Sequence, residues 1–375
     1  MSWSTPASPS RRSPIRTRTN PARSWSRSME SAKQIIESYN GRKLRVMEVC
    51  GTHTHEIFRL GIRRILPPQI ELISGPGCPV CVTPAGYIDE AVMLALEHGA
   101  VICTFGDLIR VPGSEMSLAG ARSKGAAVKT VYSPLDAVDF ARENPDKQVV
   151  FLAVGFETTV PAACLAVKKA AAEGLANFSI LGANKTMPNA YKALKGSADA
   201  FLYPGHVNAI TGTAVCEDLV KLGVSGVVAG FTADEILTAL AVIIRLSASG
   251  EPFFRNCYPR VVRPEGSPAA LKLMDTVMEP CDAEWRGLGV IPMSGLKLRP
   301  AFAAYDARLK FSLPPVAGRS NPACRCGEVL QGKCKSTDCK LFGTACTPLH
   351  PVGACMVSNE GACSAYYQYG DILNG

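Results

Sequence analysis

The segment from Cys324 to Cys363 contains seven of the fifteen cysteines of this chain within forty residues. Its other residues are largely Gly, Pro and small polar types, with a turn signal every few positions. Such a stretch cannot bury enough apolar surface to order itself, so a cross-link or a bound group has to hold it. Disulfides would indicate a secreted scaffold, zinc a structural knuckle, and an iron–sulfur cluster a redox centre.

The composition of the whole chain bounds its partners and its location. At 375 residues it is long enough for two or three domains, each with its own apolar core. The formal net charge is +8, but six arginines lie in residues 1–28, and the remainder carries only roughly +2, which gives no support for a nucleic-acid partner. The longest apolar run, residues 236–246, is too short to span a bilayer, and a hydrophobic secretion signal is lacking. We therefore expect a cytoplasmic protein with no membrane contact.

Residues 1–28 consist mainly of Ser, Arg and Pro and contain no acidic residue. We predict a disordered tail here; the alternatives are an organelle transit peptide and an upstream start codon misassigned before Met29. A cytoplasmic location matters for the cysteines, because a reducing cytosol favours metal or redox chemistry over structural disulfides. The odd total of fifteen cysteines also argues against a set of structural disulfides, because disulfides use cysteines in pairs.

Between residue 43 and about residue 230, short β-branched runs alternate with amphipathic stretches. This rhythm is typical of parallel sheets with helices on both faces, so we predict an α/β fold with two such sheets, one ending near residue 135 and one covering about 136–250. The predicted domains are 29–135, 136–265 and a small cysteine-rich domain, 266–375. The predicted strands are 44–49, 70–73, 101–105, 128–132, 149–154, 179–182, 200–203 and 224–229, and the predicted helices are 87–97, 135–143, 161–173 and 234–246.

Five of these strands run directly into unusual turns. The turns are CGTHTHE (50–56), SGPGCPVC (74–81), GD (106–107), GFETT (155–159) and PGHVNA (204–209). In open α/β sheets, ligands bind at the carboxyl ends of the strands, so we predict one crevice lined from both sheets. The ordinary need of strand–helix turns for Gly and Pro explains the glycines but not the cysteines and histidines.

Cys50 follows the first predicted strand and opens a predicted helix. We expect the amide N–H groups and the helix dipole there to lower the pKa of the Cys50 thiol and so make a thiolate nucleophile or ligand available. His53 and His55 add ligand or proton-transfer capacity. A simple helix cap with solvent-facing histidines is the alternative.

Cys78 and Cys81 form a CxxC pair directly before a predicted helix start. Such a pair can be a dithiol/disulfide couple or half of a metal site, and spacing leaves both readings open beside an inert pair. With Cys50 and one histidine it would also make a four-ligand zinc set.

Glu157 in GFETT and His206 in PGHV add one carboxylate and one imidazole, and each motif alone is weak. The sequence has neither a GxGxxG turn after its first strand nor a GxxxxGK[ST] loop, so it predicts no nucleotide site. For the C-terminal cysteines, the irregular gaps disfavour a zinc knuckle and favour an iron–sulfur cluster, with zinc and disulfides as alternatives.

Taken in this order, these motifs and the terminal phrases CRCGEVL, CTP and PVGACMVSNEGACSAYYQYG resemble the HypD family of hydrogenase expression/formation proteins. The resemblance covers residues 29–375. It implies two α/β domains and a third domain with a [4Fe-4S] cluster. It also implies a scaffold that assembles the Fe(CN)2CO unit of [NiFe]-hydrogenase with a HypC-type chaperone and a HypE-type cyanide donor.

The resemblance also assigns roles to residues. Cys50 would bind the iron shared with the chaperone, Cys78 and Cys81 would form a redox-active pair beside it, and His53 and His55 would line the site. The expected cluster ligands are Cys326, Cys339, Cys346 and Cys363, with Cys324 and Cys355 in reserve and Cys334 incidental. Two alternatives are a stand-alone iron–sulfur thiol-disulfide oxidoreductase and a zinc-stabilised binding module with no redox role.

Overall fold

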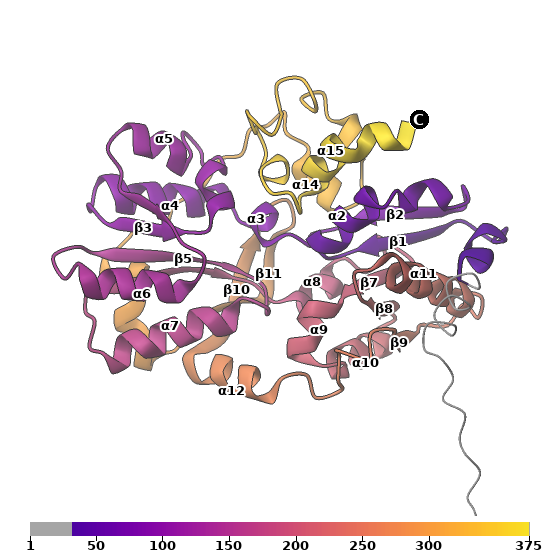
Figure 1. Cartoon of the computed structure of the whole chain (residues 1–375), viewed down its shortest axis with the longest axis horizontal. Helices are drawn as coiled ribbons and strands as arrows, with labels where there is room; N and C mark the ends of the chain where they lie inside the picture. The colour runs from indigo at the N-terminus through magenta and orange to yellow at the C-terminus, as the bar shows by residue number, and fades with distance from the viewer. Residues whose placement is uncertain (1–31, 375) are drawn as a thin grey trace, which may run out of the picture.

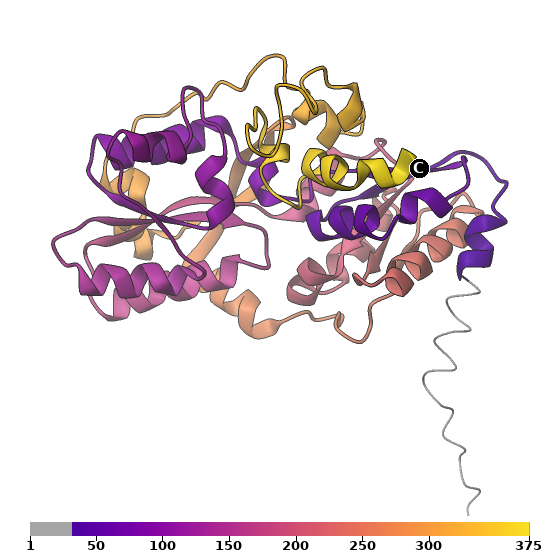
Figure 2. The same ribbon diagram turned by 45° about the horizontal axis from the view of Figure 1, so that its top comes forward.

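The computed structural model describes residues 32–374, so the predicted tail, 1–28, lies outside the described residues. Two α/β units lie side by side, and the C-terminal region, yellow in Figure 1, crosses the top of their junction. The view in Figure 2 shows the same region lying along α2 (Gly51–Arg59).

Sheet A is a five-stranded parallel sheet with the order β2-β1-β7-β8-β9. One face packs against α2 and α11 (Ala233–Ser247), and the other against α8 (Met187–Ala193) and α10 (Ala214–Lys221). Both faces are therefore buried, as the continuous apolar character of its strands requires. The strands are β1 (Leu44–Glu48), β2 (Ile70–Ser74), β7 (Ala200–Pro204), β8 (Gly226–Ala229) and β9 (Phe254–Asn256).

Sheet B is a four-stranded parallel sheet with the order β4-β3-β5-β6. Its strand β5 (Val149–Gly155) is buried along its whole length. The other strands are β3 (Val101–Thr104), β4 (Val128–Thr130) and β6 (Phe178–Asn184); α4 (Ala85–Leu96) and α5 (Leu118–Ser123) cover one face, and α6 (Pro134–Glu143) and α7 (Val160–Ala172) the other.

All eight predicted strands and all four predicted helices are present, and the α/β class is confirmed. The predicted membership of the sheets is wrong. β1 pairs with β7, which lies more than 150 residues later, and the division near residue 135 falls inside sheet B. Periodicity identifies strands but not their partners, and the chain leaves sheet A after β2, builds sheet B, and then returns. The domain boundaries themselves stay predictions.

A two-stranded antiparallel hairpin, β10 (Met278–Trp285) and β11 (Gly289–Leu298), joins the two units and was not predicted. Each strand contains a proline and few β-branched residues, so the usual strand signal is weak. Trp285 at its tip is fully buried, stacks on Phe156 at 5.8 Å between ring centroids, and donates its indole N–H to Ser294 Oγ.

The remaining elements are short or lie in the C-terminal half. They are η1 (Ile62–Ile65), α3 (Pro79–Val82), η2 (Gly106–Arg110), α9 (Gly205–Thr211), α12 (Pro268–Val277), η3 (Pro300–Tyr305), α13 (Ala307–Lys310), α14 (Cys326–Leu330), η4 (Ser336–Asp338), η5 (Ala354–Met356) and α15 (Ala362–Asn374). Within residues 32–374, no helix is both long and apolar enough to cross a membrane.

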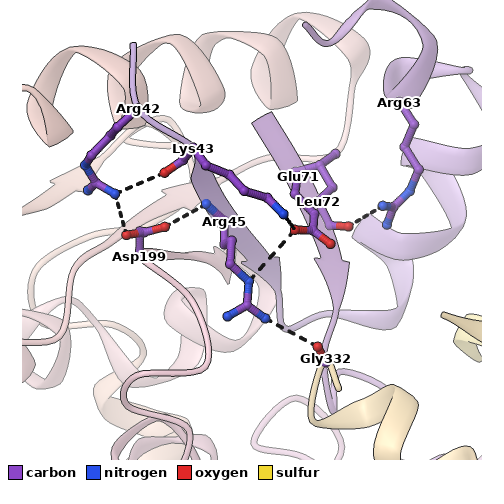
Figure 3. A network of polar contacts seen from close by, with 8 residues as sticks. All are labelled: Arg42, Lys43, Arg45, Arg63, Glu71, Leu72, Asp199 and Gly332. Carbon is purple, nitrogen blue, oxygen red and sulfur yellow. Dashed lines mark hydrogen bonds and ion pairs between the residues drawn. The ribbon is translucent and has the colours of Figure 1, made fainter. Parts of the chain in front are cut away.

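Asp199 fixes the junction of β1 and β7 at their amino-terminal ends (Figure 3). Its carboxylate accepts hydrogen bonds from the Arg45 backbone N–H and the Arg42 guanidinium, each at 2.7 Å. The side chain is only 28% exposed, so these bonds are partly shielded from water. Asp199 thus helps to join strands that are distant in sequence.

We expect Asp199→Ala to lower the free energy of unfolding by about 1–2 kcal/mol, because the partly buried Arg45 N–H loses its acceptor. The matched control is Asp218→Ala, whose carboxylate is 69% exposed and pairs only with Lys221. Asp218→Ala should lower the free energy of unfolding by less than about 0.5 kcal/mol. Denaturant unfolding followed by circular dichroism measures both, and equal effects would contradict the assigned role.

Candidate functional site

Cys50 and the CPVC turn are held together by their main chains at the carboxyl ends of β1 and β2. The Gly51 N–H donates to the Gly77 carbonyl oxygen at 3.0 Å, and the Gly75 N–H donates to the Glu48 carbonyl oxygen at 2.8 Å. A Cβ on Gly77 would collide with the backbone of Cys50, so only glycine permits this approach. The predicted convergence of these two turns is therefore present.

Cys50 is the N-cap residue of α2, and its side chain is buried. Its sulfur is close to the N–H groups of Thr52 and His53, which favour the thiolate, but burial dominates and raises the pKa of the thiol to about 12. The expected lowering of this pKa by the helix N-terminus is therefore wrong for the metal-free protein. The thiol is protonated at neutral pH.

Cys78 and Cys81 are buried free thiols on either side of the start of α3. A hydrogen bond between the two side chains, together with burial, raises the pKa of Cys81 well above its ordinary value. The predicted CxxC pair therefore forms a compact dithiol next to Cys50. Two neighbouring reduced thiols can be oxidised to a disulfide with the loss of two electrons and two protons.

His53, in the first turn of α2, is fully buried. Its Nε2 lies 2.8 Å from the Gly230 carbonyl oxygen, so Nε2 carries the proton, and the buried Nδ1 has no partner within residues 32–374. Burial lowers the pKa of His53 to about 4, and the imidazole is neutral. His206 is exposed, and both rings stack on Phe231, which follows β8.

His55 lies away from His53. Residues two apart on a helix lie on different sides of it, and His55 faces the C-terminal region, where its Nδ1 is 3.3 Å from the Asn359 carbonyl oxygen and its ring meets Tyr369 edge-on. His53 and His55 therefore face different parts of the fold, and the role of His55 stays a prediction.

Glu157 enters from sheet B and is buried. Its Oε1 accepts the Met187 N–H at 2.8 Å, while Oε2 is buried with no partner among the described residues. Burial raises the pKa of Glu157 to about 7. Tyr191, one turn along α8 from Met187, is close enough to feel the charges of both Glu157 and Cys50.

Glu360 is a site residue that sequence reasoning missed. Its Oε1 accepts the Thr52 hydroxyl at 2.7 Å, and its side chain packs against Gly51. Its charge acts on Cys50, Cys81 and His206, in each case favouring the protonated form. Glu360 lies in the quoted phrase SNEGAC, but nothing in the spacing connects it with a residue some 300 positions earlier.

Arg286, beyond the tip of β10, is the second missed residue. It is 9% exposed, its Nε donates to the Thr83 carbonyl oxygen at 2.7 Å, and one terminal nitrogen has no partner in the described part of the chain. Burial lowers the pKa of Arg286, and the negative charges of ionised Cys81 and Cys324 oppose that shift. A buried cation thus lies between the dithiol and the C-terminal cysteines.

Six of the seven C-terminal cysteines line one pocket, including all four predicted cluster ligands, whereas Cys334 lies elsewhere. The Cys326 sulfur is paired with that of Cys355 in a disulfide, so in this state Cys326 is not available as a thiolate ligand. The lining free thiols are Cys324, Cys339, Cys346 and Cys363.

The donor set of this pocket suits a thiolate-bound metal group, which can be an iron–sulfur cluster or zinc. Its donors are all sulfur, and the remaining lining residues, such as Val329, Leu341 and Phe342, are apolar. Burial raises the pKa of Cys363 to about 12, and the charges of neighbouring cysteines add to this, so the Cys363 thiol is protonated without a cation. Within residues 32–374, no three Cys, His, Asp or Glu side chains stand in an arrangement already set to hold a metal ion.

Comparison with known proteins identifies the family. Residues 26–370 match the family model HypD, described as the hydrogenase formation hypA family. The chain belongs to the HypD family. It is 43% identical to the hydrogenase maturation factor HypD of Rhodobacter capsulatus over 88% of this chain and 90% of that protein. It is 42% identical to the HypD of Escherichia coli K12, over 92% and 96% of the two chains.

Glu157 gives a pH-dependent stability. Its folded pKa, about 7, is above its unfolded value, so the folded state holds a proton that the unfolded state has lost, and stability falls as pH rises from about 4.5 to 7. We expect Glu157→Gln to reduce this pH-dependent fall in the free energy of unfolding by up to about 3 kcal/mol. Denaturant unfolding at pH 5 and pH 8 measures it; parallel pH profiles for both proteins would contradict the burial argument.

Proposed function

We propose that this protein is a cytoplasmic scaffold on which the Fe(CN)2CO unit of [NiFe]-hydrogenase is assembled, with the iron held by Cys50. The observation that carries the proposal is the main-chain contact between Gly77 and Cys50, which joins the turn with one buried thiol to the turn with a buried dithiol. One thiol can hold a metal ion while the other two supply electrons. The chain belongs to a hydrogenase-formation family, which indicates that the product of this chemistry is part of a hydrogenase.

Iron binding at Cys50 has to displace the thiol proton, because the pKa of the free thiol is about 12. The iron is the substrate of this site and replaces the proton as the counter-charge of the sulfur. Thr52 and His53 provide N–H groups that stabilise the thiolate once it forms. Iron affinity is therefore expected to rise with pH.

The dithiol and the C-terminal pocket supply the electrons in this proposal. Oxidation of Cys78 and Cys81 to a disulfide releases two electrons and two protons, which balances a two-electron reduction at the iron site. A [4Fe-4S] cluster, when bound, would exchange single electrons with that pair. Arg286 lies between the two sulfur sites and provides a fixed positive charge for thiolates on both sides.

Cys339, Cys346 and Cys363 are predicted ligands that line the pocket as free thiols, and Cys326 would be the fourth, with Cys324 and Cys355 in reserve. The Cys326–Cys355 disulfide favours Cys324, but in a reducing cytoplasm both of those sulfurs are expected to be thiols. The pocket therefore has six candidate donors and needs only four.

The partners proposed from the resemblance are a HypC-type chaperone, which shares the iron, and a HypE-type cyanide donor. Cys50 itself is 8% exposed, whereas His206 on the same edge is exposed. A partner that shares the iron would have to approach from this side, next to Phe231 and Glu360.

The cluster assignment can be tested by single substitutions in anaerobically purified protein. We expect Cys339→Ala and Cys363→Ala to lose most of the brown visible absorption and the bound iron and sulfide, while Cys334→Ala keeps them. Comparing Cys324→Ala with Cys326→Ala identifies the fourth ligand. A colourless wild-type protein with one equivalent of zinc would rule out both redox readings.

The scaffold role can be tested at Cys50. Infrared spectra of the protein co-purified with its chaperone should contain bands of cyanide and carbonyl bound to iron, and Cys50→Ala should lose them while keeping the cluster absorption. Cys164→Ala, which changes a buried thiol far from the site in α7, is the matched control and should keep both. Bands that persist in Cys50→Ala would contradict the proposal, and a dithiol that cycles without any bands would favour the stand-alone oxidoreductase.

A further inference from the structure

A groove outside the sulfur sites runs between sheet A and the C-terminal region. One wall is the edge strand β2, which contributes all five of its residues, and the other is the turn and bend at 332–335 with Ser336, the first residue of η4. We call it the basic groove. Its cationic lining residues are Lys43, Arg63, Arg64, Lys333 and Lys335, and its acidic ones are Glu71 and Asp338.

Two of these cations are already satisfied within the fold (Figure 3). Lys43 lies 2.9 Å from the Glu71 carboxylate, and Arg63 binds Glu48 and the Leu72 carbonyl oxygen. Nearby, Arg45 reaches Glu71 at 3.9 Å and donates to the Gly332 carbonyl oxygen at 3.3 Å, so the two walls are tied together beneath the groove.

Three cations of the groove have no such partner. Arg64, Lys333 and Lys335 are exposed and form no ion pair within residues 32–374. The body of the protein has little net charge outside its first 28 residues, so this local positive excess is a feature of the groove. Such a concentration attracts an acidic ligand and speeds its association.

The shape of the groove indicates what kind of acidic ligand fits. Five strand residues give it a length of about 16 Å, which suits an extended peptide of about five residues. Apolar side chains such as Leu66, Ile70 and Val329 lie among the charges, so a segment in which acidic and apolar residues alternate would match both. A nucleic acid fits less well, because the basic surface is short and the Glu71 and Asp338 carboxylates repel phosphates.

We propose that the basic groove binds an extended acidic segment of a partner protein. The N-terminal residues of this chain are excluded as the occupant by charge, because residues 1–28 carry six arginines and no acid. The groove also borders the cysteine pocket, since Val329 lines both. A docked segment therefore lies beside the proposed cluster without touching Cys50.

The test uses the full chain and a fluorescent peptide of about eight residues with alternating Glu and Val. Fluorescence anisotropy should show binding that weakens as salt rises, and the equivalent Gln/Val and Lys/Val peptides should bind far less. Arg64→Glu/Lys333→Glu/Lys335→Glu should weaken the binding of the Glu/Val peptide about tenfold or more.

The matched control is Lys124→Glu/Lys168→Glu/Lys272→Glu. It makes the same change in net charge at three exposed lysines outside the groove, and it should leave the affinity for the peptide within about twofold. If the first triple variant does not fold, as judged by circular dichroism, Lys333→Gln/Lys335→Gln replaces it, with a smaller loss expected. Hydrogen exchange should show peptide-dependent protection at residues 70–74 and 332–338.

Several results would overturn the proposal. These are failure of the wild-type chain to bind at low salt, equal binding of the Gln/Val peptide, and protection confined to other regions. Displacement of the peptide by inorganic phosphate or an oligonucleotide at lower concentration than by unlabelled peptide would identify a different ligand. Self-association that disappears in the triple variant would identify a second copy of this chain as the occupant. None of these results depends on iron or cluster content, so they do not bear on the scaffold role.

Discussion

The contact between Gly77 and the backbone of Cys50 is the interaction on which the sulfur chemistry depends. It is made of main-chain atoms, so it fixes the positions of Cys50, Cys78 and Cys81 without relying on the flexibility of side chains. The contact exists because β1 and β2 are neighbours in a parallel sheet and end at the same edge. A side chain at Gly77 would separate the turns, whatever else remained intact.

Burial is the second constraint, and it favours the uncharged form of most of the ionisable groups here. It keeps the thiols of Cys50 and Cys81 protonated, His53 neutral, and Glu157 close to half-protonated near neutral pH. Without a cation the site therefore holds protons instead of charges. Arg286 is the exception, a buried cation with an unsatisfied nitrogen between two groups of thiols.

Much of the fold could be predicted because strands and helices have local signatures, and the approach of the CPVC turn to Cys50 follows from the strand ends at which both lie. Which strands pair with each other, and which distant residues meet at the site, could not be predicted. The return of the chain from sheet B to pair β7 with β1, and the approach of Glu360 to Thr52, are non-local contacts with no periodic signal. The pKa of Cys50 was misjudged because the sequence reveals a helix N-terminus but not the depth at which it is buried. The pairing of Cys326 with Cys355 was likewise invisible in the spacing.

The order of strands in sheet A has a consequence for synthesis. β1 and β2 leave the ribosome early, yet their sheet is completed only when β7, β8 and β9 have followed, and Glu360 reaches Thr52 from 308 residues further along the chain. At about 5–20 residues per second, that separation takes roughly 15–60 s to translate. During this interval Cys50, Cys78 and Cys81 lack most of the structure that buries them. The nascent chain therefore exposes these thiols before the fold can bury them, and chaperones that shield an unfinished sheet would also protect the thiols from early reaction.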